Sequence, residues 1–119
     1  MRTENPCFQR RTGVNSNPAP VDFLRLELNP KNFFLLPYHH LELVKFEDSG
    51  GQDTITLLFL NRTVCITGKS LRVLALGLQD RSVEFVKPLP ERYASLVGDE
   101  ATVRTIEIQD AKEPAESRS

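Results

Sequence analysis

The tripeptide Gly68-Lys69-Ser70 comes closer to a chemical motif than any other string in this sequence. It stands between an apolar stretch with strand character and a leucine-rich stretch with helical character. A phosphate-binding loop ends in this way, with backbone amides and a lysine holding the anion at a helix start. That loop also requires a glycine five residues before Gly68, and this position is Thr63. We therefore predict a tight turn at Gly68, with Ser70 capping the helix, and no nucleotide site.

The pair His39-His40 is the second candidate for chemistry. Adjacent residues of a strand point to opposite faces of a sheet, so the two imidazoles are not expected to share a metal ion. No ligand spacing marks a third or fourth donor, and no motif marks a serine or cysteine nucleophile. We predict a non-catalytic protein without metal or cofactor. His39, His40, Lys69 and Arg72 remain as candidate ligand-binding residues.

The composition narrows the possible partners. The chain has 119 residues and a formal net charge of −1, and its basic residues are scattered without interleaved aromatic residues. Nucleic acid is therefore not an expected partner. The apolar runs are too short to cross a bilayer, and the N-terminus has no apolar segment typical of a secretion signal. These features predict a cytoplasmic protein in which Cys7 and Cys65 are free thiols.

The elements that must position these residues are mostly strands. Leu24, Leu26 and Leu28 alternate with charged residues, which is the period-two pattern of a half-buried strand. Similar patterns recur along the chain, separated by turn signals such as Asn29-Pro30 and Gly50-Gly51. The strands or extended segments expected from them cover residues 21–28, 33–37, 38–47, 53–60, 63–67, 82–87 and 102–109.

The run from Leu41 to Thr67 is predicted to be a three-stranded antiparallel meander. Its first strand carries Leu41 and Leu43 on one face but Val44 and Phe46 on the other. Such a switch indicates either a β-bulge or a strand that is buried on both sides. The strand at 53–60 has the clearest pattern, and its core residues are expected to be Ile55, Leu57 and Phe59.

One principal helix is expected. Leu71, Leu74, Ala75 and Leu78 are spaced as the apolar stripe of a short amphipathic helix. The residues at 91–97 favour one or two further helical turns. The predicted fold class is α+β, with a mainly antiparallel sheet of about five to six strands and the helix packed on one face. We expect a flexible arm at 1–20, a single domain at 21–109 and a disordered tail at 110–119.

The apolar surplus provides the functional hypothesis. Phe33-Phe34-Leu35-Leu36 and the two-faced strand at 53–60 supply more apolar surface than one helix can cover. The N-terminal strand and the segment at 89–97 are available to cover it, and so is a second subunit. We therefore expect a protein-interaction or assembly module that self-associates through a sheet face or edge, or binds another protein. The alternative is a small-ligand-binding domain or minor enzyme with a pocket between helix and meander.

Overall fold

The computed structural model describes residues 7–13, 15, 17, 19–89 and 101–110, and the helical turns expected at 91–97 lie outside them. Within that part of the chain, strands dominate and one α-helix is present, α1 (Arg72–Gln79). A short 3-10 helix, η2 (Tyr38–His40), occupies the start of the segment that was expected to be a strand at 38–47. The strands are β1 (Phe8–Arg10), β2 (Phe23–Asn29), β3 (Asn32–Pro37), β4 (Leu41–Asp48), β5 (Asp53–Phe59), β6 (Arg62–Lys69), β7 (Val83–Val86) and β8 (Thr102–Asp110).

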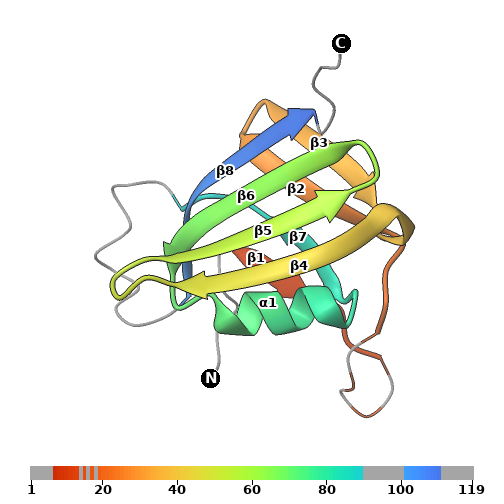
Figure 1. The fold of residues 1–119 in the computed structure, drawn as a ribbon. Helices are drawn as coiled ribbons and strands as arrows, with labels where there is room; N and C mark the ends of the chain where they lie inside the picture. Colours follow the sequence, from red (N-terminus) through yellow and green to blue (C-terminus); the bar gives the residue numbers. More distant parts are fainter. Residues whose placement is uncertain (1–6, 14, 16, 18, 90–100, 111–119) are drawn as a thin grey trace.

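The strands form two four-stranded sheets, as Figure 1 shows, instead of one meander of five to six strands. The first sheet has the order β1-β7-β2-β3 and is mixed, because β2 and β7 run parallel. The second sheet has the order β4-β5-β6-β8 and is antiparallel throughout. The α+β class and the antiparallel meander are therefore confirmed. Part of the apolar surplus of the sequence, including Leu36, Ile55, Leu57 and Phe59, lies in the core that the two sheets share, whereas Phe33 and Leu35 remain exposed.

The second sheet contains the meander expected between Leu41 and Thr67. Ile55, Leu57 and Phe59 alternate along β5 and are buried. The register of β4 against β5 shifts between Leu41 and Leu43, so the switch of apolar face in this strand is a β-bulge. After the bulge, Val44 and Phe46 pack against the core while Leu43 remains exposed.

The first sheet is built around the β2–β3 hairpin. Leu24 and Leu36 are paired across this hairpin and face the core, whereas Arg25 and Leu35 are paired on its other face. The hairpin turn lies at Asn29–Asn32, as expected, and Asn29 accepts a hydrogen bond from the backbone amide of Lys31 at 2.8 Å. The segment at 33–37, expected only to be extended, is thus an edge strand of this sheet.

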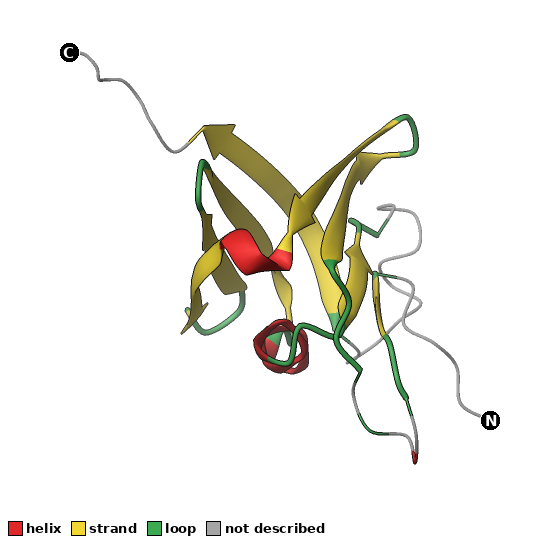
Figure 2. Ribbon diagram, turned by 90° about the vertical axis from the view of Figure 1, so that its right-hand side faces the viewer, coloured by secondary structure: helices red, strands yellow, loops and turns green. Residues whose placement is uncertain are grey.

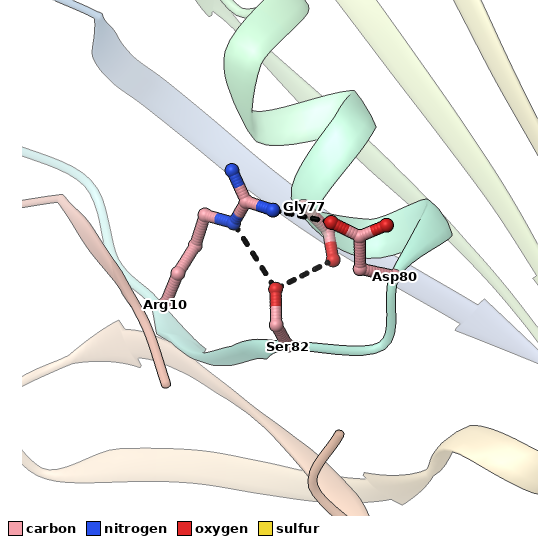
Figure 3. A network of polar contacts seen from close by, with 4 residues as sticks. All are labelled: Arg10, Gly77, Asp80 and Ser82. Atoms are coloured by element: carbon pink, nitrogen blue, oxygen red, sulfur yellow. Dashed lines mark hydrogen bonds and ion pairs between the residues drawn. The ribbon is translucent and has the colours of Figure 1, made fainter. Parts of the chain in front are cut away.

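The first sheet begins inside the segment that the sequence assigns to an N-terminal arm. Phe8 pairs with Val86 of β7, and both side chains are buried. Arg10 then reaches the C-terminal end of α1, as Figure 3 shows. Its guanidinium group pairs with the Asp80 carboxylate and donates a hydrogen bond to the Ser82 hydroxyl at 3.1 Å. These contacts tie the start of the chain to a segment 72 positions away.

Helix α1 lies between the lower ends of the two sheets, where Figure 2 shows it end-on. It contacts β4 of the second sheet and β7 of the first, so it is not packed on the face of a single sheet. Leu71, Leu74 and Leu78 point into the shared core and are buried. None of the helices among the described residues is long and apolar enough to cross a membrane.

The C-terminal end of α1 adopts the Schellman arrangement. The amide of Ser82 donates to the Gly77 carbonyl, and the amide of Arg81 donates to the Leu78 carbonyl, each at 3.1 Å. This arrangement requires a left-handed residue after the C-cap, a role that glycine usually fills. Arg81 fills it here, with a φ of 61°.

Candidate functional site

Gly68 has a different role from the turn that the sequence suggested. It belongs to strand β6 and is paired with Asp53 on one side and Val103 on the other. A Cβ atom at this position would lie 2.0 Å from the Thr102 carbonyl oxygen. Glycine is therefore required because the backbone of β8 approaches β6 too closely for any side chain.

The turn into α1 is made by Ser70, which has a φ of 58°. The N-cap residue, Leu71, makes no side-chain hydrogen bond that caps the helix. Instead, the Asp53 carboxylate accepts a hydrogen bond from the Leu71 amide at 2.8 Å. A carboxylate from β5 thus accepts the hydrogen bond of an amide at the helix start, and its negative charge disfavours a second anion there. This arrangement argues against anion binding at Gly68-Lys69-Ser70, and it replaces the predicted capping by Ser70.

His39 and His40 lie on η2 and not on a strand. The two imidazole rings are therefore on the same side of the turn and contact each other edge to face, with centroids 4.4 Å apart. No other histidine, cysteine, aspartate or glutamate joins them in a group of three within the described residues. The expectation that the rings point apart is wrong, because a 3-10 turn does not alternate its side chains as a strand does.

Lys69 and Arg72 lie at the opposite end of β4 from the histidines. His40 directly precedes the first residue of β4. At the other end of β4, its last residue pairs with Asp53 of β5, and Asp53 pairs in turn with Gly68, the residue before Lys69. β4 has eight residues, a span of about 25 Å at the rise of a β-strand. The four candidate residues are therefore not gathered in one pocket between helix and meander. The guanidinium group of Arg72 stacks over the Phe46 ring, 5.0 Å from its centroid.

The two cysteines are free thiols. Burial raises the pKa of the Cys7 thiol, whose sulfur accepts a hydrogen bond from the Val103 amide at 3.3 Å. Burial also raises the pKa of Cys65, and the nearby Glu107 carboxylate adds to this effect. A raised pKa keeps a thiol protonated near neutral pH, whereas the thiolate is the nucleophile. These environments suit structural cysteines better than catalytic ones.

The most distinctive surface lies on the first sheet, on the face turned away from the core. We call it the outer face, and it carries the residues that point outward from β2, β3 and β7: Phe23, Arg25, Glu27, Phe33, Leu35 and Phe85. Phe33 is 58% exposed, Leu35 54% and Phe23 50%. The apolar run at 33–36 signals this face in the sequence, but only the hairpin register shows which of its residues point outward.

Charge on the outer face is organised around Arg25. Its guanidinium group lies 5.3 Å from the centroid of the Phe85 ring and 6.0 Å from that of Phe33. It also forms an ion pair with Glu27, with 2.7 Å between Nε and the carboxylate oxygen. An arginine held between aromatic rings and a carboxylate loses little conformational freedom when a partner covers it.

Comparison with protein-family models, with curated protein sequences and with solved structures finds no match for this chain.

Proposed function

We propose that this protein is a non-catalytic interaction module that self-associates through the outer face of its first sheet. One observation carries the proposal: Phe23, Phe33 and Leu35 lie on two adjacent strands, share one face and remain at least half exposed. Burying apolar surface of this kind contributes roughly 25 cal/mol per Å² to association. A contiguous exposed apolar patch on a small domain is typical of an interface.

The composition of the outer face supports a protein partner. Interface cores are enriched in aromatic residues and arginine, and the side chains that contribute most to affinity are of these types. Arg25 with its two phenylalanine rings provides such a group. Rim charges that complement each other then fix the orientation of the partners.

The charge balance supports a second copy of this chain over a strongly charged partner. Arg25 is matched by Glu27 on the same strand, and Lys87 borders the face with its ammonium group 5.7 Å from the Phe85 centroid. Nucleic acid and anionic lipid are recognised by surfaces with a clear excess of positive charge. In a two-fold symmetric pair, by contrast, Arg25 of one copy can face Glu27 of the other.

Sedimentation velocity of the full chain from 1 to 100 µM tests the proposal. We expect a concentration-dependent dimer for the wild type and a monomer for the double variant Phe33→Ser/Leu35→Ser. The matched control is Leu60→Ser, because Leu60 is 54% exposed but lies on the β5–β6 turn. A wild type that remains monomeric at 100 µM, or a dimer that the double variant leaves intact, would overturn the proposal.

A further inference from the structure

A groove lies between the edge strand β3 and the β5–β6 turn, and Leu35 of the outer face borders it. Its volume is about 240 Å³, and its apolar wall includes Phe34, Leu36 and Phe59. Three polar side chains share the same lining: His40, Asn61 and Arg62. Small-molecule sites likewise combine apolar side chains with polar groups that orient the ligand, and in this groove nearly as much of the lining is polar as apolar.

Arg62 is the group that defines the chemistry of this groove. Its guanidinium group lies over the Phe34 ring, 5.7 Å from the centroid, so the aromatic ring holds it against the groove wall. Its ion pair with Asp110 is long, 3.5 Å, and the Asp110 side chain is 77% exposed. An exposed ion pair of this kind contributes little free energy. A ligand can therefore take donors of Arg62 from Asp110 at small cost.

The donors of the groove match a carboxylate. A guanidinium group presents its N–H groups as a fork that fits two carboxylate oxygens. The Asn61 amide and an imidazole N–H of His40 are further donors in the same lining. The volume is below the 300–1,000 Å³ typical of drug-sized ligands. The apolar wall requires that the rest of the ligand be a short hydrocarbon or a single ring.

We propose that this groove binds a small organic monocarboxylate, with its carboxylate on Arg62 and its apolar body against Phe34, Leu36 and Phe59. The site is distinct from the candidates at Lys69 and Arg72, and it includes His40 but not the helix. The proposal does not rest on self-association.

An NMR titration of the ¹⁵N-labelled full chain with three probes tests it. Benzoate carries the charge and the ring, benzamide keeps the ring without the charge, and acetate keeps the charge without the ring. We expect benzoate to shift the amide signals of residues 34–36 and 59–62, with an affinity about tenfold higher than that of either other probe. Benzamide lacks the charge-assisted hydrogen bonds to Arg62, and acetate lacks the ring that covers the apolar wall. Equal affinity for benzamide, equal affinity for acetate, or no shift with benzoate would each overturn the proposal.

Two variants assign the effect to Arg62. Arg62→Gln is expected to weaken benzoate binding about tenfold and to leave benzamide binding unchanged. Arg104→Gln removes an exposed arginine from β8 that does not line the groove, and it should leave both unchanged. An unchanged benzoate affinity in Arg62→Gln contradicts the assignment. If Arg62→Gln does not fold, the comparison of the three probes on the wild type decides alone.

Discussion

Gly68 and Ser70 show how residues two positions apart can exchange the roles that their types suggest. Glycine is the usual residue at positive φ, yet Ser70 takes the left-handed conformation while Gly68 lies within a strand. The sequence indicates that a glycine is needed near this turn, since strand and helix signals meet there. It does not show that the need comes from β8, because the close approach joins residues more than 30 positions apart.

Replacing Gly68 with alanine should be strongly destabilising. The added Cβ would lie 2.0 Å from the Thr102 carbonyl oxygen and 3.0 Å from the Val103 Cα atom, so β6 and β8 must separate. We expect a loss of about 3 kcal/mol in the free energy of unfolding, measured by urea denaturation. Gly51→Ala is the control, because nothing lies within 4 Å of a Cβ there. Equal stability of the two variants would refute the steric role of Gly68.

Tyr38 should make the protein sensitive to alkaline pH. Its side chain is buried, its hydroxyl donates to the Val83 carbonyl at 2.8 Å, and burial raises its pKa above the ordinary value of about 10. Because the folded pKa is raised, this contribution to stability is complete below pH 10 and decreases as pH rises above it. The expected loss approaches 1.4 kcal/mol per pH unit.

The comparison of wild type with Tyr38→Phe isolates this effect. At pH 7 the variant should be about 1–2 kcal/mol less stable, because the buried Val83 carbonyl loses its donor. Between pH 10 and 11 its stability should decrease less steeply than that of the wild type, so the two curves converge. Parallel curves, measured by chemical denaturation at each pH, would contradict the prediction. The raised pKa values of Cys7 and Cys65 affect both proteins equally.

At the scale of elements, α1 begins where it does because of a residue in another element. The spacing of Leu71, Leu74 and Leu78 predicts the helix and its buried side correctly. Its cap, however, is the Asp53 carboxylate at the start of β5, 18 positions earlier. Capping by a distant side chain leaves no local pattern in the sequence, whereas an N-cap serine or aspartate does.

Substitutions of Asp53 test this cap. Asp53→Ala leaves the Leu71 amide without its acceptor and should lower the free energy of unfolding by about 1 kcal/mol. Asp53→Asn keeps an acceptor oxygen of the same reach and should remain close to the wild type. Thermal unfolding followed by circular dichroism can separate the two variants. Equal destabilisation by alanine and asparagine would mean that the hydrogen bond to Leu71 does not stabilise the helix start.

The strands divide clearly into those that sequence patterns can place and those that they cannot. The meander β4-β5-β6 was predictable because its strands are consecutive and its turns are short. The bulge in β4 was one of two interpretations of the alternation at Leu41–Phe46, and the register against β5 decides between them. β1 was not predictable as a strand, since three residues without apolar alternation acquire their conformation from the pairing with β7.

At the scale of the whole molecule, the division of the strands into two sheets could not be predicted from the sequence. Alternation identifies strands, but it does not specify whether a strand such as β2 joins its neighbours in sequence or a distant strand such as β7. β7 pairs in parallel with β2 and antiparallel with β1, and both partners lie more than 50 positions before it in the sequence. The outer face and the groove could not be predicted from the sequence for the same reason, because each combines residues from more than one strand.

The pairing of β1 with β7 also has a consequence for how the protein folds during its synthesis on the ribosome. The segment containing Arg10 is synthesised early, but its partner around Ser82 emerges 72 residues later. Closing so long a loop is slow, whereas β5 pairs with β4 and β6 pairs with β5, each with the strand made just before it. We therefore expect the β4-β5-β6 part of the second sheet to assemble first, before β7 and β8 are made. Until β7 arrives, the apolar inner side of the β2–β3 hairpin has only that nascent sheet to shield it from other chains.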